Sequence, residues 1–393
     1  MNKSKKILWI TTHPISYQTP LLNTINSSKY IDLNVIYFDL FSDREYYDHL
    51  FNRNIFWNSE TIKNFQWIKT QSIKISKKEQ TFFSPLVFGL YKEINKVKPD
   101  YVVITGWNHY ALILSAIYSK ILKIKLIIRS EAYIDSDESV KYRFLKRLYL
   151  SMFDVIGYIG TKNKEFYTNI LKNNKKRYVY LPYSVDNNKF LCTNKSYFKK
   201  SLCKKLNFDS SLPLFIYVGK LTFRKNIKYL ITCFDKLITN KRIKANLLVV
   251  GSGSLEQKCK EILINNSNIK FTGFVDQKDL KEYYSSADIL VIPSLFEPWG
   301  LVLNEAMAAG CAIIASDKVI STFDLVINNY NGFIYSNERN ELENAIMTML
   351  SNDYSDFGVK GINLLKLKSN YDIIKNNLED LIKHESEHHC TDL

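Results

Sequence analysis

The sequence is poor in cysteine and contains no long apolar run. Six cysteines are spread over 393 residues without a Cys-x-x-Cys pair, which is typical of reduced thiols in a cytoplasmic protein. No apolar run approaches the roughly 18 residues expected of a membrane-spanning helix. The basic start MNKSKKILWITTH has only a short apolar part and no small-residue cleavage site. We therefore expect it to form a first β-strand and not a signal peptide.

Acidic residues are too few to balance the basic ones. The formal net charge is +15, while the hydrophobic content of 46% and the aromatic content of 14% describe an ordered globular chain of two or three domains. Such a charge suggests anionic partners, namely nucleic acid, acidic lipid headgroups or phosphorylated substrates. A general bias of composition toward lysine would explain it equally well. No nucleic-acid-binding motif accompanies the charge, so we expect no nucleic-acid partner.

Short apolar runs alternate with helical patterns along the whole chain, which predicts an α/β fold with parallel, doubly wound sheets. The helical patterns include residues 86–97 and 109–122. The predicted strands of the first half are residues 6–11, 32–38, 100–105, 125–130 and 154–159. Those of the second half are residues 212–219, 245–251, 268–273, 288–294 and 311–316. A polar stretch, residues 184–196, is the expected linker.

The most informative stretch is DILVIPSLFEPWGLVLNEAMAAGCAIIAS, residues 288–316. A buried strand is followed by a loop broken by Pro298 and Gly300, a helix that ends at Gly310, and a second strand. Ligands bind such βαβ units at the carboxyl ends of the strands. Glu297 on the loop and Glu305 on the helix bracket this turn, with seven residues between them.

The segment FEPWGLVLNE resembles the E-x7-E signature of the retaining glycosyltransferases of family 4, which have the GT-B fold. The resemblance implies two doubly wound, Rossmann-like domains that face a central cleft. It predicts an acceptor domain at residues 1–186 and a nucleotide-sugar donor domain at residues 187–368. A last helix within residues 369–393 crosses back to the first domain and precedes a polar tail.

Two glutamates eight positions apart on one helix would be separated by roughly 12 Å. A retaining glycosidase pair needs about 5.5 Å, so these carboxylates are not expected to work as nucleophile and acid on one bond. We expect Glu305 to accept hydrogen bonds from ribose hydroxyls and Glu297 to hold the transferred sugar, and the resemblance implies the same roles. The backbone N–H groups of Gly300, Leu301 and Val302 open the helix and suit a diphosphate.

A basic turn, within YVGKLTFRKN, follows the strand that ends at Gly219. Lys220, Arg224 and Lys225 can neutralise the departing nucleoside diphosphate. Lys225 matches the family's lysine, whereas Lys220 stands where the family has arginine, which forms a bidentate fork. The segment Gly273, Phe274 and Val275 resembles the part of the family whose backbone meets the nucleobase.

The first half matches the family less closely. His13, Tyr17 and Gln18 stand where the family often has a glycine-rich loop, and they are our candidates for the acceptor or sugar side. Arg129, Ser130 and Glu131 stand where many members carry a histidine, which makes Arg129 a catalytic candidate and Glu131 an acceptor-side candidate. His109 is a nearby alternative to that histidine, although a histidine that starts a helix is more often structural. Asp135 and Asp137 form an isolated D-x-D motif, and we expect no metal or other cofactor.

Residues 139–153 form a basic amphipathic pattern that suits an anionic membrane and equally an ordinary helix packed on a sheet. The prediction is a cytoplasmic glycosyltransferase, peripheral on the inner membrane face if this helix binds lipid. It transfers sugar from a nucleoside-diphosphate donor to a sugar or lipid-linked acceptor hydroxyl, with retention, in cell-surface polysaccharide or glycolipid assembly. A nucleotide-sugar 2-epimerase of the same architecture and a non-catalytic membrane- or polyanion-binding scaffold are the alternatives.

Overall fold

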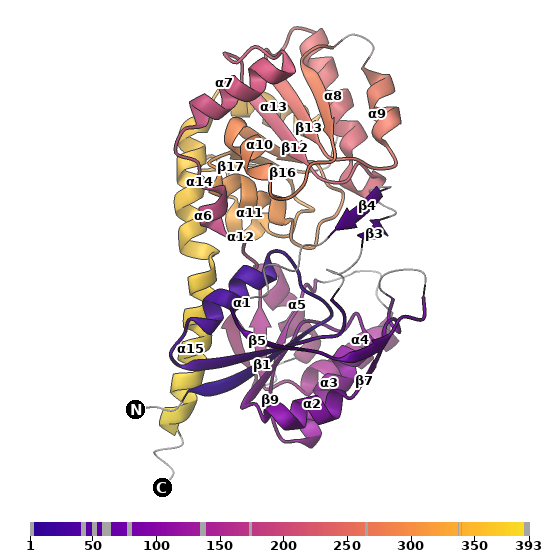
Figure 1. Ribbon diagram of the computed structural model, residues 1–393. Coiled ribbons are helices and arrows are strands. Elements are labelled where there is room, and N and C mark those ends of the chain that lie inside the picture. The colour runs from indigo at the N-terminus through magenta and orange to yellow at the C-terminus, as the bar shows by residue number, and fades with distance from the viewer. Residues whose placement is uncertain are drawn as a thin grey trace. The chain divides into compact units, whose positions relative to one another are not determined.

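The computed structural model describes residues 4–40, 45–48, 53–56, 64–76, 81–133, 139–172, 175–263, 266–336, 338 and 340–388. The chain divides into two compact units. Figure 1 shows the chain coloured from its N-terminus in indigo to its C-terminus in yellow. The N-terminal unit comprises residues 1–46, 54–183 and 371–393. The C-terminal unit comprises residues 47–53 and 184–370.

The N-terminal unit is built on a seven-stranded sheet in which every pairing is parallel, with the order β11-β10-β9-β8-β1-β2-β5. Its strands are β1 (Lys5–Thr11), β2 (Ile31–Tyr37), β5 (Gln66–Lys69), β8 (Tyr101–Ile104), β9 (Lys125–Arg129), β10 (Val155–Tyr158) and β11 (Arg177–Tyr180). Its helices are α1 (Gln18–Asn26), α2 (Leu90–Val97), α3 (Tyr110–Ile121), α4 (Val140–Ser151), α5 (Thr161–Leu171) and α15 (Tyr371–His388). Two short pairs, β3 (Glu45–Asp48) with β4 (Arg53–Phe56) and β6 (Gln71–Ile73) with β7 (Leu86–Phe88), lie outside the sheet.

Helices cover both faces of this sheet because its strands are apolar on both sides. Ile7 and Trp9 of β1 pack in one core with α1 and α15. Leu8 and Ile10, which alternate with them, pack in a second core with α2, α3 and α5. This arrangement confirms the predicted doubly wound α/β architecture.

The predicted helix at residues 86–97 is wrong in its first part. Leu86–Phe88 forms β7, which pairs antiparallel with β6, and α2 begins only at Leu90. Gly89 between them has a left-handed backbone with φ of 76°, which an L-residue in a continuous helix cannot adopt. The apolar residues on both sides of Gly89 therefore belong to two different elements.

The C-terminal unit contains a six-stranded parallel sheet with the order β14-β13-β12-β15-β16-β17. Its strands are β12 (Leu214–Val218), β13 (Asn246–Val250), β14 (Ile269–Gly273), β15 (Ile289–Ile292), β16 (Ala312–Ser316) and β17 (Gly332–Tyr335). Its helices are α6 (Asn187–Phe190), α7 (Lys195–Leu206), the 3-10 turn η3 (Phe223–Lys225), α8 (Ile227–Thr239), α9 (Glu256–Ile262), α10 (Leu280–Ser286), α11 (Leu301–Ala308), α12 (Thr322–Leu325), α13 (Glu341–Leu350) and α14 (Tyr354–Lys368). One face of the sheet packs against α8, α9 and α13.

The stretch expected to be a linker, residues 184–196, is folded for part of its length. It contains α6, which Asp186 caps by accepting hydrogen bonds from the N–H groups of Asn188 and Lys189. Phe190 at the end of α6 is buried and meets the ring of Tyr284 edge-on, with centroids 5.8 Å apart. The stretch is mostly polar in sequence, but it is anchored by two buried apolar side chains, Val185 and Phe190.

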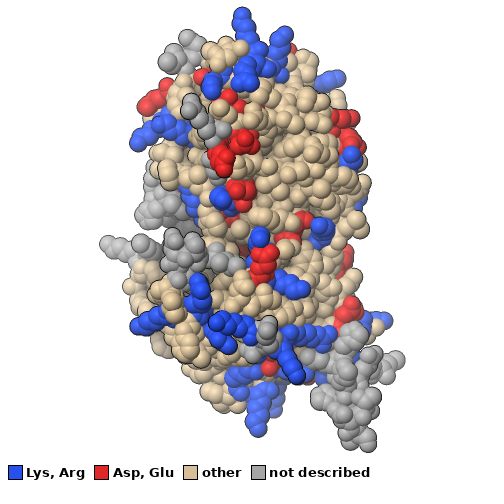
Figure 2. Space-filling model, turned by 180° about the vertical axis from the view of Figure 1, so that it is seen from behind, with Lys and Arg blue, Asp and Glu red and all other residues tan. Residues whose placement is uncertain are grey.

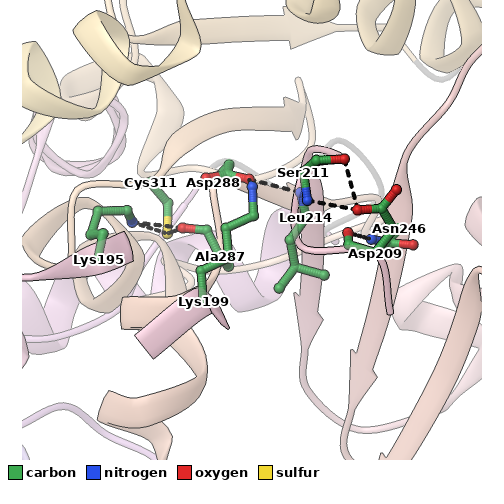
Figure 3. A network of polar contacts seen from close by, with 9 residues as sticks. All are labelled: Lys195, Lys199, Asp209, Ser211, Leu214, Asn246, Ala287, Asp288 and Cys311. Carbon is green, nitrogen blue, oxygen red and sulfur yellow. Dashed lines mark hydrogen bonds and ion pairs between the residues drawn. The ribbon is translucent and has the colours of Figure 1, made fainter. Parts of the chain in front are cut away.

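A polar network fixes α7 to the amino ends of the strands, as Figure 3 shows. Lys199 forms an ion pair of 2.6 Å with Asp288, and the same carboxylate oxygen accepts a 2.8 Å hydrogen bond from the N–H of Leu214 at the start of β12. Lys195 donates to the carbonyl of Ala287, which also accepts a hydrogen bond from the thiol of Cys311. This network therefore holds the edge of the sheet opposite to the carboxyl ends of the strands.

The five described cysteines form no disulfide. Within the described part of the chain, no helix has both the length and the apolar composition needed to cross a bilayer.

Candidate functional site

The order of strands in the C-terminal sheet reverses at β12, whose neighbours are β13 and β15. Ligands of doubly wound sheets bind beyond the carboxyl ends of the strands at such a reversal. The loop after β12 is the basic turn predicted from the sequence, and the loop after β15 is the predicted turn that carries Glu297. The N–H of Leu295 donates to the carbonyl of Arg224 at 2.9 Å, so the backbones of the two loops are directly joined.

Lys225 and Glu297 meet at this edge. The ammonium group of Lys225 forms an ion pair with Oε2 of Glu297, and both side chains are largely buried. Burial makes such a pair sensitive to the loss of either partner, because the remaining charge would lack compensation. The backbone of Glu297 is also fixed, since its N–H donates to the carbonyl of Lys318 and its carbonyl accepts from the N–H of Ile320.

Helix α11 begins immediately after this loop. Gly300 at its start has φ of 88°, and a Cβ there would approach Cγ of Glu297 to 3.1 Å. No described side chain caps the helix, so the N–H groups at Leu301 and Val302 open toward the loop. The fully buried hydroxyl of Ser321 lies near Gly300 and has no hydrogen-bond partner among the described residues. These donors suit an anion.

Glu305 lies on the second turn of α11 and is buried. Its Oε2 accepts a 2.8 Å hydrogen bond from the hydroxyl of Tyr284 on α10. Burial raises the pKa of this carboxyl to about 7. Three smaller effects lower it, namely the hydrogen bond from Tyr284, the positive charge of Lys189 and a hydrogen bond from Gln277. The carboxylate is thus held in one orientation while it keeps capacity to accept further hydrogen bonds.

The turn after β12 places the other predicted cations. Gly219 has φ of 153°, and the hydroxyl of Tyr217 donates to the carbonyl of Lys220 at 2.8 Å, which fixes the backbone of that lysine. The side chain of Lys220 is half-buried, whereas that of Arg224 is exposed. The structure therefore joins Lys225 to Glu297 and places Lys220 on the same turn as Lys225, while Arg224 contributes its carbonyl to the contact between the two loops.

The glycines of VVGSGS have a structural explanation. A Cβ on Gly251 would lie 1.9 Å from the carbonyl oxygen of Gly219, and one on Gly253 would lie 2.6 Å from that of Leu221. The N–H of Gly251 donates to the carbonyl of Gly273, the first residue of the predicted nucleobase segment. Close backbone packing therefore requires these glycines, and it holds Gly273 beside the turn, followed by the half-buried Phe274 and Val275.

The sheet of the N-terminal unit reverses at β1, between β2 and β8. A pocket of about 330 Å³ lies at the carboxyl ends of these strands. Five of the six acceptor-side and catalytic candidates of this unit line it, together with Gly106 and Trp107 of the loop after β8. The five are His13, Tyr17, Gln18, Arg129 and Glu131.

Arg129 is the buried cation of this pocket. Its Nε donates to the carbonyl of Leu181 at 3.0 Å and its Nη2 to that of Pro182 at 2.7 Å. Its guanidinium lies 4.5 Å from the ring centroid of Tyr183, a cation–π distance. Two of its donor groups are thus committed to the backbone at the end of the unit, so Arg129 also positions that segment.

Burial changes the protonation of the other pocket residues. It lowers the pKa of His13 to about 4, so this imidazole is neutral at physiological pH. Burial and the negative charge of Glu131 raise the pKa of the Tyr17 hydroxyl to about 12. The pocket therefore offers neutral hydrogen-bonding groups with one carboxylate and one guanidinium, which suits a polyhydroxylated ligand.

His109 does not line this pocket. Its Nδ1 accepts a hydrogen bond from the N–H of Ala111 and so caps α3, while its ring lines a smaller neighbouring cavity of about 220 Å³. Asp135 and Asp137 lie outside the described residues. Among the residues that are described, no three His, Cys, Asp or Glu side chains are grouped so as to hold a metal ion.

Three residues around Glu305 were not predicted from the sequence, namely Tyr284, Gln277 and Lys189. The position of Tyr284 could have been inferred in part, because KEYYSSAD stands just before a buried strand and so places Tyr284 on the helix that precedes β15. Gln277 and Lys189 lie in ordinary polar segments, which allow no such inference.

Residues 198–363, all in the C-terminal unit, match the family model described as "Glycosyl transferases group 1". The C-terminal unit thus contains a glycosyl transferases group 1 domain. Over 139 residues the chain is 37% identical to an uncharacterized glycosyltransferase of Methanocaldococcus jannaschii, a match that covers 33% of this chain and 35% of that protein. The chain therefore spans about a third of the length of this relative.

A longer match reaches a Campylobacter jejuni alpha-1,4-N-acetyl-D-galactosaminyltransferase whose name includes a PP-undecaprenol-linked glycan. It is 24% identical over 279 residues and covers 67% of this chain and 70% of that protein. Among solved structures, the Anabaena protein HepE in complex with UDP and glucose matches with a TM-score of 0.68 and 15% identity, covering 97% of this chain and 100% of that chain. At this identity the likeness shows the fold alone, which is the GT-B fold of two Rossmann-like halves.

Proposed function

We propose that this protein is a glycosyltransferase that moves a sugar from a nucleoside-diphosphate donor to an acceptor hydroxyl, with retention at the anomeric carbon. One observation carries the proposal. At the strand-order reversal of a glycosyl transferases group 1 domain, Lys225 and Glu297 meet beside the open N-terminus of α11. This arrangement supplies positive charge for a diphosphate and a carboxylate for sugar hydroxyls within one site.

Each part of the donor has a candidate partner in the C-terminal unit. Glu305 accepts from the ribose hydroxyls, and Gly273, Phe274 and Val275 meet the nucleobase. The N–H groups of Gly300, Leu301 and Val302, with Lys220 and Arg224, bind the diphosphate. Lys225 stabilises the charge that develops on the departing phosphate oxygen, so no metal is required. Glu297 holds the sugar.

In the transfer step the bond between the anomeric carbon and the phosphate oxygen breaks, and a bond forms from the acceptor oxygen to the same face of that carbon. The acceptor proton passes to the departing phosphate oxygen. A nucleophilic carboxylate is then unnecessary, which agrees with the engagement of Glu297 by Lys225. The pocket around His13, Tyr17 and Gln18 receives the acceptor, with Arg129 and Glu131 in its wall.

The acceptor belongs to cell-surface polysaccharide or glycolipid assembly in this proposal, and the protein works in the cytoplasm at the inner face of the membrane. The name of the Campylobacter jejuni relative, with its PP-undecaprenol-linked glycan, supports the first part. Buried cysteines without disulfides support the second.

A panel of nucleoside diphosphates and sugar nucleotides, tested by thermal shift and then for turnover, examines the proposal. Tight ligands raise the melting temperature by mass action. Glu305→Ala should weaken nucleotide binding by about 1.5–3 kcal/mol, whereas Glu282→Ala, at an exposed position of the same unit, should not. The anomeric configuration of the product, read by NMR, decides between retention and inversion.

Two results would replace the proposal. Release of free nucleoside diphosphate with an isomerised sugar, in the absence of any acceptor, identifies a 2-epimerase. Binding of acidic vesicles that high salt abolishes, with no turnover of any donor, identifies a scaffold.

A further inference from the structure

The outer face of α4 carries a row of exposed apolar side chains. Val140, Phe144 and Leu148 are spaced four residues apart, so they lie next to one another along the helix. Their exposed fractions are 82%, 59% and 51%. Leu150 is the only residue of α4 that is buried. Contiguous apolar surface of this kind usually marks a site of association.

Cations flank that row. Helix α4 contains Lys141, Arg143, Lys146 and Arg147 and no acidic residue. Arg143 and Arg147, one turn apart, follow one side of the apolar row, and Lys141 lies on the other side. Lys146 instead lies against the rings of Trp107 and Phe166, at 5.9 Å and 5.6 Å from their centroids. The apolar row is therefore bordered by three cations, Lys141, Arg143 and Arg147, on the outer side of α4.

The positive charge extends beyond the helix. Figure 2 shows Lys and Arg side chains gathered over the N-terminal unit, in the lower half of the view, with few Asp or Glu side chains among them. Such a surface attracts an anionic partner over the distance that salt screening allows.

The inner side of α4 is attached to the wall of the pocket in the N-terminal unit. The hydroxyl of Tyr149 donates to the carbonyl of Gly106 at 3.1 Å. The ring of Trp107 lies edge-on to that of Tyr149, with centroids 6.2 Å apart. Gly106 and Trp107 both line the pocket, so whatever α4 binds lies close to the ligand of that pocket.

We propose that α4 docks on an anionic lipid surface and that the acceptor entering the neighbouring pocket is carried by a lipid of that surface. The apolar row enters the interface between headgroups and acyl chains, and Lys141, Arg143 and Arg147 contact lipid phosphates. The statement about the acceptor rests on the proposed function, whereas the docking does not. An apolar protein partner would match the row but not its cationic borders, and a nucleic acid would match the cations but not the row.

Sedimentation with vesicles tests the docking directly. Vesicles of equal parts phosphatidylcholine and phosphatidylglycerol should retain the protein at low salt, and vesicles of phosphatidylcholine alone should not. Each outward cation contributes about a fivefold factor, so Arg143→Ala with Arg147→Ala should weaken binding about 25-fold. Phe144→Ser with Leu148→Ser should abolish it, because lipid insertion needs the apolar row.

Helix α2 offers a matched control. Lys92 and Lys96 are also exposed and one turn apart on a helix of the same unit. Lys92→Ala with Lys96→Ala removes the same charge and should change vesicle binding by less than about twofold, since these residues lie outside the proposed face. An equal loss in this control would show that only net charge matters and would overturn the proposal.

A tryptophan placed in the row reports insertion. Phe144→Trp should be quenched by brominated phosphatidylglycerol vesicles more than the wild type, while Tyr91→Trp on α2 should not. Equal quenching of the two variants rejects insertion. A dimer in solution that Phe144→Ser with Leu148→Ser dissolves would identify the face as a contact between copies, and it would also reject the proposal.

The thermal shift given by nucleoside diphosphates, measured on the same variants, separates this inference from the proposed function. The shift should equal that of the wild type in every α4 variant, because the donor residues lie in the other unit. If the protein binds vesicles but nucleoside diphosphates do not change its melting temperature, the docking is supported and the proposed donor site is refuted. If nucleoside diphosphates raise the melting temperature but the protein does not bind vesicles, the donor site is supported and the docking is refuted.

Discussion

The hydroxyl of Tyr284 donates a 2.8 Å hydrogen bond to Oε2 of Glu305, between helices α10 and α11 of the C-terminal unit. Both side chains are buried, and burial is the main reason that the pKa of Glu305 rises to about 7. The hydroxyl of Tyr284, Lys189 on α6 and Gln277 after β14 oppose this rise. The charge of Glu305 at neutral pH is therefore set by its burial and by three neighbouring residues that lie outside α11.

Glu305→Gln should stabilise the ligand-free protein at high pH. The folded carboxyl has a pKa of about 7 against the ordinary 4.5, so its favourable contribution is complete below about pH 4.5 and is lost as pH rises through 7. The loss amounts to about 3 kcal/mol. Urea denaturation of both proteins should therefore show the variant gaining about that much between about pH 4.5 and pH 8. A stability difference that is constant over this range would contradict the assigned protonation of Glu305.

Tyr284→Phe should weaken the binding of a nucleoside diphosphate through the protonation of Glu305, the proposed ribose ligand. Loss of the hydroxyl leaves Glu305 more protonated at pH 7, so calorimetry should give an affinity about five- to tenfold lower, recovering at pH 9. The ring is kept, so its contact with Phe190 remains. In a Glu305→Gln background the same substitution should have little effect. An equal loss at every pH would indicate a packing defect.

Lys225→Ala should lower the turnover of bound donor about 100-fold, and Lys225→Arg should lower it less, because in the proposed mechanism this charge stabilises the departing phosphate. Lys228→Ala, at an exposed position one turn further along, is the matched control. EDTA should leave the wild-type rate unchanged. A rate that EDTA abolishes and Mg or Mn restores would refute metal-free transfer and direct attention to Asp135 and Asp137.

Gly251→Ala should destabilise the fold by about 2–4 kcal/mol, since its Cβ would collide with the carbonyl oxygen of Gly219. Gly273→Ala is the control, because its Cβ would meet no atom within 4 Å and only its φ of 72° opposes the change. That strain costs about 1–2 kcal/mol. Denaturation curves that rank the two variants the other way would argue against tight backbone packing between these loops.

Asp288→Ala should destabilise the protein by about 3–5 kcal/mol, because it leaves Lys199 and the N–H of Leu214 without their partner. The affinity for nucleoside diphosphates should not change, since this network lies at the amino ends of the strands. Glu256→Ala removes an exposed ion pair with Lys260 and should cost less than about 1 kcal/mol.

Much of the fold could be predicted because the central strands are buried on both faces and therefore form continuous apolar runs. β15 and β16 are buried along their whole length, and both were recognised from their sequences. The edge strands β5 and β17 are short and partly exposed, so their composition does not distinguish them from loops. The helix at residues 86–97 was misjudged because periodicity alone does not reveal a left-handed glycine.

The gathering of candidate residues follows from the same geometry. Parallel strands end at one edge, so residues near the ends of different strands come together there. Lys225 and Glu297 form an ion pair, and His13 and Arg129 line the same pocket. Contacts made by side chains away from the strand ends obey no such rule. Gln277 and Lys189 reach Glu305 from 28 and 116 residues away in the sequence, and nothing in their own surroundings indicates this.

Helix α15 gives the chain an order of assembly. Ile374, Leu378, Leu381 and Ile382 complete the same core as Ile7 and Trp9, although residues 184–370 of the C-terminal unit lie between them in the sequence. The C-terminal unit is nearly continuous in sequence, so its core can close on the ribosome before α15 is made. The part of the N-terminal sheet that α15 covers must wait until that helix emerges. A messenger truncated before Tyr371 would therefore yield a product with this part of the sheet exposed and prone to aggregate, even though every predicted donor residue is present.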